Sequence, residues 1–228
     1  IEENPFDLTL FYGNSIKNET VNLSGDCELI KNKYFCEKFV DLTEFEKLVT
    51  KNTKIVCCSH VSNVIGKINP IEAIIAKAKS VGAITVIDGA QAIAHFNIDV
   101  QKLACDFYVF SAHKMYGPTG VGVLYGKQAL LDVMTPYQAG GEMIKTVSFT
   151  QATTFNTLPF KFEAGTPNIA GVIAFSQAIS FMEQFHGAAV RQYEQSLTQY
   201  CYDCLARIPQ VTFIVSEVPD IPVLSFTI

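Results

Sequence analysis

The fold is decided by residues 55–88, which read IVCCSHVSNVIGKINPIEAIIAKAKSVGAITVID. The runs 55–58 and 84–87 have the length and β-branched composition of buried strands. Between them Asn69 is placed to cap a helix, Pro70 suits its first turn, Glu72 favours its positive end, and Gly82 closes it. The residues expected on its buried face are Ile71, Ile74, Ile75, Ala78 and Val81.

A strand, a helix and a strand in about thirty residues form a βαβ unit, which predicts an α/β fold with a mostly parallel sheet. Ligands of such sheets gather at the carboxyl ends of the strands. Asn63, Asp88 and Ser111 each follow or end a candidate strand, so we expect them to face one crevice.

Composition excludes several classes of protein. The 228 residues suit one or two domains, and 49% hydrophobic with 17% charged residues excludes a disordered chain. A net charge of −5 gives no basic footprint for nucleic acid, and no apolar run approaches the ~20 residues of a membrane span. Seven cysteines, an odd number, favour reduced thiols, with the cytoplasm as the default compartment and an organelle matrix as the alternative.

The rest of the chain supplies further elements. We expect helices at 41–49, 127–134, 166–185 and 187–205, and strands at 106–110, 121–125, 211–215 and 223–228. Residues 1–40 show no clear period, and 146–162 read as irregular or extended. Cys201 and Cys204 form a C-x-x-C, but in a helical pattern and without a second pair, which favours ordinary helix thiols over a zinc or redox site.

The residues at the strand ends suit one cofactor. Lys114 follows the strand at 106–110 and precedes a Gly/Pro turn, and Asp88 ends the strand at 84–87. Singly, such an aspartate is more often a helix cap and such a lysine is more often solvated. Together with small and hydroxylated neighbours, they supply the amine, the carboxylate and the phosphate donors that pyridoxal 5'-phosphate requires.

Five segments resemble a known family: HVSN (60–63), DGAQ (88–91), DFYVFSAHK (106–114), YGPTG (116–120) and FEAGTPN (162–168). They are similar to the cysteine desulfurase and selenocysteine lyase family, and most of all to its SufS- and CsdA-like subgroup. This is a branch of the class V aminotransferases with the fold-type I architecture of pyridoxal phosphate enzymes. The resemblance runs from about residue 41 to residue 228.

The resemblance implies a role for each matching residue. Lys114 would form the Schiff base with the cofactor, and Asp88 would pair with the pyridine nitrogen. Gln91 would contact the ring oxygen, and Ser111 and His113 would hold the phosphate.

Two further roles reach beyond the cofactor ring. Asn63 would lie by the ring oxygen and the substrate carboxylate, and Thr166 would reach the phosphate bound in the other subunit of a homodimer. The implied reaction converts L-cysteine to L-alanine and passes sulfur to an enzyme cysteine, and then to an acceptor protein for iron–sulfur cluster assembly. Selenocysteine and cysteine sulfinate are alternative substrates. The alternatives to this function are a truncated or non-catalytic module and another class V enzyme, such as a kynureninase-like lyase.

The sequence also departs from the family pattern. Residues 1–40 lack the family's ring-stacking histidine and phosphate-binding threonine motifs. Arg191 and Arg207, the two arginines, lie outside any Arg-x-Gly-x-x-Cys loop, where the family carries its persulfide-forming cysteine. We therefore expect a fragment, with weak or absent activity on its own. Its expected parts are an N-terminal segment (1–40), a partial cofactor-binding large domain (41–186) and the start of a small α+β C-terminal domain (187–228).

Overall fold

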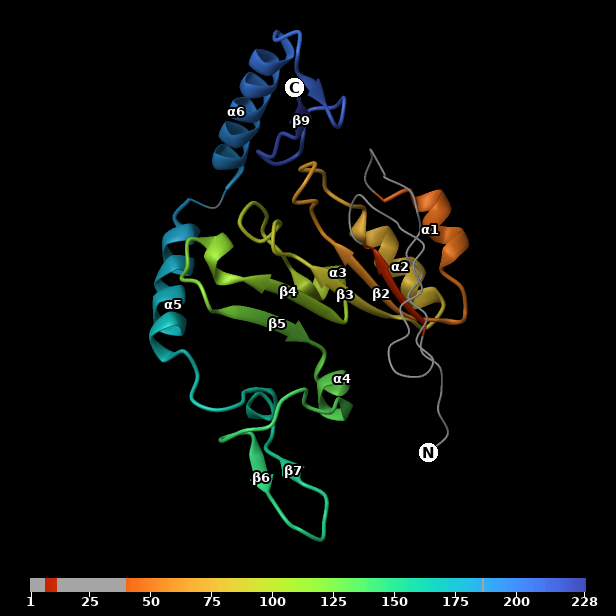
Figure 1. The fold of residues 1–228 in the computed structure, drawn as a ribbon, viewed down its shortest axis with the longest axis vertical. Helices are drawn as coiled ribbons and strands as arrows, with labels where there is room; N and C mark the ends of the chain where they lie inside the picture. The colour runs from red at the N-terminus through yellow and green to blue at the C-terminus, as the bar shows by residue number, and fades with distance from the viewer. Residues whose placement is uncertain (1–6, 12–39, 186) are drawn as a thin grey trace.

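The computed structural model describes residues 7–11, 40–185 and 187–228, and its centre is a five-stranded sheet (Figure 1). The strands follow one another in the order β1-β2-β3-β4-β5, with β1 to β4 parallel and β5 antiparallel to β4. They are β1 (Asp7–Phe11), β2 (Thr53–Ser59), β3 (Ile84–Asp88), β4 (Phe107–Ser111) and β5 (Gly122–Gly126). The predicted α/β fold with a mostly parallel sheet is confirmed. The first strand was not foreseen.

Three helices cover the sheet through one apolar core: α1 (Leu42–Leu48), α2 (Ile71–Ser80) and α3 (Val100–Leu103). The buried face of α2 consists of Ile71, Ile74, Ile75 and Ala78, as the period predicted, and the half-buried Val81 packs beside it. The helix at 41–49 is confirmed as α1, with Asp41 as its N-cap. The short α3 was missed.

The predicted cap of α2 was wrong. The N-cap position is Pro70, which makes no side-chain cap hydrogen bond. Asn69 instead donates from Nδ2 to the Ser59 carbonyl at 2.8 Å and accepts from the Val40 backbone N–H at 3.1 Å. Its amide therefore joins the end of β2 to the segment before α1 rather than capping the helix that follows it.

The second half of the chain extends from the β5 side of the sheet to both ends of the molecule (Figure 1). Helix α5 stands across the end of the sheet where β4 ends and β5 begins, the β6–β7 hairpin projects at one end of the molecule, and α6 leads to the C-terminus at the other. The elements are α4 (Gln128–Val133), β6 (Ile144–Thr146), β7 (Thr154–Phe155), the 3-10 helix η2 (Phe160–Phe162), α5 (Ile169–Glu183), α6 (Ala188–Ala206), β8 (Thr212–Phe213) and β9 (Phe226–Thr227).

The helix predictions for this half hold and its strand predictions were too long. Asn168 caps α5 by accepting from the Gly171 N–H at 3.0 Å. The strands expected at 211–215 and 223–228 shorten to β8 and β9, which form an antiparallel pair of two residues each. No helix within the described residues is long and apolar enough to cross a membrane.

Candidate active site

The candidate site lies at the carboxyl edge of three adjacent parallel strands. Register aligns Ser59 of β2, Asp88 of β3 and Val109 of β4, so these residues are level across the sheet. Ser111 ends β4 two residues further on. Asp88 and Ser111 are thus the last residues of neighbouring strands, which is the edge where a ligand of a parallel sheet is expected.

The backbone on both sides of Asp88 is held from both neighbouring strands. The His60 N–H donates to the Asp88 carbonyl at 2.8 Å, and the Gly89 N–H donates to the Val109 carbonyl at 2.8 Å. The Asp88 side chain is exposed, and its Oδ1 accepts from the Ala90 N–H at 2.9 Å. Across the described part of the chain, the other carboxylate oxygen has no hydrogen-bond partner, which leaves it available to a ligand.

Gly89 is required where it stands. A Cβ at this position would lie 1.9 Å from Cε1 and 2.1 Å from Cζ of Tyr108, far inside van der Waals contact. The ring of Tyr108 therefore packs directly under the backbone that follows Asp88. Only a residue without a side chain permits this approach.

A buried polar pair lies beneath the same edge. The Tyr108 hydroxyl and His60 Nδ1 are 2.9 Å apart, and both side chains are buried. Burial lowers the pKa of His60, against a smaller opposing effect of Glu72, and burial raises the pKa of Tyr108. Both groups are therefore neutral near pH 7, and the Tyr108 hydroxyl and His60 Nδ1 share one hydrogen bond whose direction depends on the imidazole tautomer. Sequence reasoning noted His60 only within a motif and missed this pair.

Lys114 and its neighbours lie in a tight turn after β4. The 3-10 helix η1 (Ala112–Met115) is closed by the Ala112 N–H donating to Val121 O and by the Gly117 N–H donating to Ala112 O, both at 3.0 Å. Ala112 and Met115 are buried against α5, whereas Lys114 is half-buried and His113 is exposed. The turn thus buries its apolar residues against α5 and leaves His113 exposed and Lys114 partly exposed.

The remaining candidates are distributed around this edge. Gln91 is half-buried in the turn after β3, and Asn63 is exposed in the loop between β2 and α2. Thr166 is exposed just before α5, while the α5 residues that pack against η1 are Phe175, Ala178 and Met182, further along the helix. The structure therefore gathers most predicted site residues at one edge of the sheet and leaves Thr166 at the far end of α5. Their predicted roles in binding stay predictions.

Comparison with known proteins defines the class of this chain. Residues 28–228 match the family model described as Aminotransferase class-V. The chain therefore belongs to the class V aminotransferase family.

The similar curated proteins are named cysteine desulfurases. One, from Yersinia pseudotuberculosis serotype O:1b (strain IP 31758), is 47% identical over 173 residues, which are 76% of this chain and 43% of that protein. Another, from Yersinia pestis (strain Pestoides F), is 48% identical over 173 residues, with the same two coverages. The chain spans less than half the length of these relatives.

Two solved structures of similar fold are also named cysteine desulfurases. The cysteine desulfurase CsdA (S-sulfonic acid) from Escherichia coli aligns with 97% of this chain and 56% of its own, at a TM-score of 0.86 and 34% identity. The apo cysteine desulfurase from Thermococcus onnurineus NA1 aligns with 100% of this chain and 58% of its own, at 0.82 and 29%. At 23% identity C-DES shares the fold alone, with a TM-score of 0.72; in one of its structures glycine is covalently linked to the PLP cofactor.

Proposed function

We propose that this chain is the cofactor-binding part of a pyridoxal-phosphate-dependent cysteine desulfurase. The observation that carries the proposal is the position of Asp88, whose exposed carboxylate ends β3 beside the turn that bears Lys114. The similarity to curated cysteine desulfurases supports the same function. The cytoplasm, or an organelle matrix, remains the predicted compartment, and the division at residue 187 into two domains remains a prediction.

The donor set fits pyridoxal phosphate. A carboxylate oxygen at the strand end is suited to a protonated ring nitrogen, and an amine on the adjacent turn is suited to an aldehyde. The hydroxyl of Ser111 and the ring of His113 lie in or next to the same turn and are suited to phosphate. Tyr108 packs closely under Gly89 and so restrains the backbone next to Asp88. This packing would favour a constant position of the Asp88 carboxylate relative to the pyridine ring of the cofactor.

The bound cofactor would supply an electron sink for the negative charge that develops on the substrate. Asp88 would hold the proton on the ring nitrogen through its free carboxylate oxygen. Lys114 Nζ would anchor the cofactor, yield that position to the amino group of L-cysteine, and then move the proton at the substrate Cα. Asn63 and Gln91 would orient the substrate and the ring oxygen, and the product after loss of sulfur would be L-alanine.

The sulfur would pass to a cysteine that can form a thiolate. Burial raises the pKa of Cys57 to about 11 and that of Cys58 to about 12, so both remain protonated near neutral pH. A protonated, buried thiol is a poor nucleophile. This supports a persulfide-forming cysteine elsewhere than β2, with delivery to an acceptor protein for iron–sulfur cluster assembly.

A homodimer is part of the proposal. Helix α5 exposes large apolar side chains, including Val172 at 53%, Ile173 at 63% and Phe181 at 48% exposure. Exposed apolar surface of this kind typically marks a protein interface. Thr166 precedes the same helix, and a second copy packed on α5 would bring it to the phosphate of the other subunit.

The test is cofactor binding followed by absorbance spectroscopy. Loading with pyridoxal phosphate should produce a visible absorbance band, and Lys114→Ala should lose it because a covalent attachment to the aldehyde requires a primary amine. Lys79→Ala, an exposed lysine on α2, is the matched control and should keep the band. An unchanged band in Lys114→Ala would refute the assignment.

A second variant tests Asp88 separately. In the full-length desulfurase to which this chain would belong, Asp88→Asn should still bind cofactor, but release of alanine from L-cysteine should fall by roughly 100-fold or more, equivalent to about 2.7 kcal/mol of transition-state stabilisation. The neutral amide cannot hold the ring-nitrogen proton. Alanine release at the rate of the unmodified protein would contradict this role.

A further inference from the structure

The loop that carries Asn63 is a compact unit of residues 61–68, called here the Asn63 loop. The Ser62 N–H donates to the Lys67 carbonyl at 2.9 Å, and the Gly66 N–H donates to the Ser62 carbonyl at 3.0 Å. A β-bridge joins Val61 to Ile68 at its base. The loop is therefore closed on itself by hydrogen bonds between its own backbone groups.

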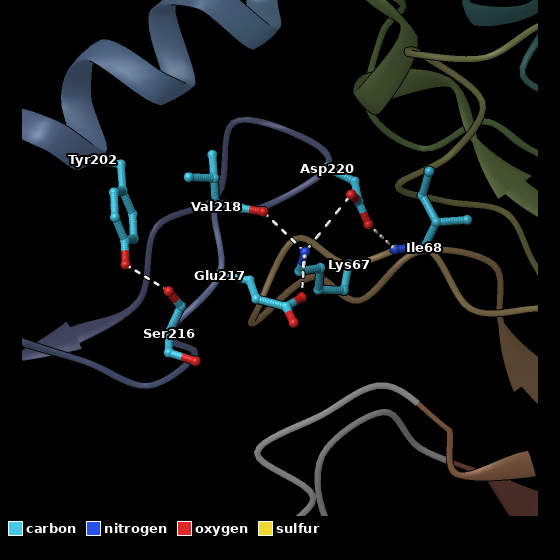
Figure 2. A network of polar contacts seen from close by, with 7 residues as sticks. All are labelled: Lys67, Ile68, Tyr202, Ser216, Glu217, Val218 and Asp220. Atoms are coloured by element: carbon cyan, nitrogen blue, oxygen red, sulfur yellow. Dashed lines mark hydrogen bonds and ion pairs between the residues drawn. The ribbon is translucent and has the colours of Figure 1, made fainter.

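Residues 216–221, about 150 residues further along the chain and called here the C-terminal segment, contact this loop. The buried ammonium group of Lys67 donates to the Val218 carbonyl at 2.9 Å and lies 3.2 Å from Glu217 Oε2 and 3.8 Å from Asp220 Oδ1 (Figure 2). Asp220 Oδ2 in turn accepts from the Ile68 N–H at 2.9 Å. We call Lys67, Glu217 and Asp220 the clamp.

The backbone of the loop at Gly66 is in close contact with the backbone of the C-terminal segment. The Gly66 carbonyl accepts from the backbone N–H groups of Asp220 at 2.9 Å and Ile221 at 3.1 Å. Gly66 has φ +64°, and a Cβ there would lie 2.9 Å from Pro219 Cβ and 2.9 Å from Val223 O. The main chain at Gly66 therefore packs directly against the main chain of residues 219–223.

The segment also reaches the second predicted ring contact. Ile221, 2% exposed, forms a buried cluster with Val61 and Ala92, and Ala92 directly follows Gln91. Both candidate ring-oxygen contacts, Asn63 and Gln91, therefore belong to backbone segments that pack on the same apolar residue.

The far end of the segment is fixed to α6. The Tyr202 hydroxyl donates to the Ser216 carbonyl at 2.7 Å (Figure 2), and the Tyr202 ring stacks on Phe213 with ring centroids 4.1 Å apart. The segment therefore bridges the α6 body and the edge of the sheet. Its charged contacts with Lys67 are the polar part of that bridge.

We propose that Lys67, Glu217 and Asp220 hold the Asn63 loop in the geometry that binds the carboxylate of the amino-acid substrate, which makes Lys67 a positioning residue. The proposal rests on the proposed function for the identity of that substrate. The clamp couples residues 216–221 to substrate affinity, while Lys114 and Asp88, which would attach the cofactor, are not part of the clamp.

The test compares Lys67→Met with Lys47→Met. Methionine keeps the apolar length of the lysine and removes its ammonium. Lys47 pairs with Glu44 at 2.6 Å, with both side chains more than half exposed, so its variant makes the same substitution at a solvated pair. The readouts are hydrogen exchange of the backbone amides at 62–68 and the affinity of the cofactor-loaded protein for L-alanine, followed by cofactor absorbance.

Lys67→Met should accelerate exchange at 62–68 and weaken L-alanine binding, each by roughly tenfold, the change that loss of one hydrogen bond from a charged group brings. The cofactor band should persist because Lys114 is unaltered, and Lys47→Met should change nothing. Asp220→Asn, which keeps an acceptor for the Ile68 N–H, should show the same two effects at smaller size. Its combination with Lys67→Met should be non-additive, because both residues serve one network.

Unchanged exchange at 62–68 in Lys67→Met overturns the proposal, as does faster exchange with unaltered L-alanine affinity. If Lys67→Met fails to fold, Asp220→Asn decides by the same two criteria. Absence of a cofactor band in the unmodified protein would instead refute the proposed function. The exchange measurement needs no cofactor and still decides whether the clamp holds the loop.

Discussion

Asp106→Ala should lower the free energy of unfolding more than the same substitution at an exposed acidic residue does. Asp106 precedes β4, and its Oδ2 accepts from both the backbone N–H and the hydroxyl of Thr85, at 2.8 and 2.9 Å. Its Oδ1 accepts from Lys127 Nζ at 2.6 Å. Thr85 is fully buried, so water cannot replace the carboxylate as the acceptor for its N–H.

The magnitude follows from the groups left without partners. A buried donor that loses its acceptor costs about 1–3 kcal/mol, and hydrogen bonds to charged groups contribute about 1.5–3 kcal/mol each. Lys127 is partly exposed and can be solvated after the change, so the full sum is not reached. We expect Asp106→Ala to lose about 3–4 kcal/mol of unfolding free energy, a large part of the ~5–15 kcal/mol of a typical domain.

The assay is urea denaturation followed by circular dichroism, with Asp132→Ala as control because Asp132 is exposed on α4. The control should change the unfolding free energy by less than about 0.5 kcal/mol. A loss below about 1 kcal/mol in Asp106→Ala would refute the argument that the Thr85 N–H depends on this carboxylate.

The pH dependence has a definite sign. Burial alone would raise the pKa of Asp106, but hydrogen bonds from Lys127 and Thr85 outweigh it, and the pKa lies below its ordinary value of 3.8. The unfolded chain therefore binds a proton at Asp106 more readily than the folded one. The stability from Asp106 should be complete above about pH 4 and lost as the pH falls through the lower folded pKa. As the pH falls through that range, the difference in unfolding free energy between the unmodified protein and Asp106→Ala should become smaller.

Two further predictions concern packing and thiols. Gly89→Ala should lower the unfolding free energy by roughly 1–3 kcal/mol, because its Cβ would overlap the Tyr108 ring, and an unchanged denaturation midpoint would contradict the close approach. Cys201 and Cys204, exposed on α6, should react with a maleimide in the folded protein. Cys58, which is buried with its pKa raised to about 12, should react only after unfolding, and mass spectrometry of the labelled peptides distinguishes the two classes.

The sequence was sufficient wherever a local rule decided the outcome. The apolar period of 71–81 predicted the buried face of α2. The start of α5 is also set locally, because Asn168 accepts from the backbone N–H of Gly171, three residues further on. The sequence did not predict that Asn69 leaves the N-cap position of α2 without a side-chain hydrogen bond. Its partners, the Ser59 carbonyl and the Val40 N–H, are distant in sequence and come near only in the folded chain. A capping preference of about 1 kcal/mol yields when a buried alternative offers two hydrogen bonds.

By itself, the sequence determined the α/β class, the order β2-α2-β3 and β4-β5, the helices α4, α5 and α6, and the residues that lie at the strand ends, because periodicity and turn chemistry act over a few residues. The tertiary structure alone decided that Tyr108 supports Asp88 from beneath through Gly89, and that Lys67 meets Asp220 across 152 residues of chain. Such contacts depend on which segments the sheet brings together. Burial then turns ordinary polar side chains into groups that must find those partners.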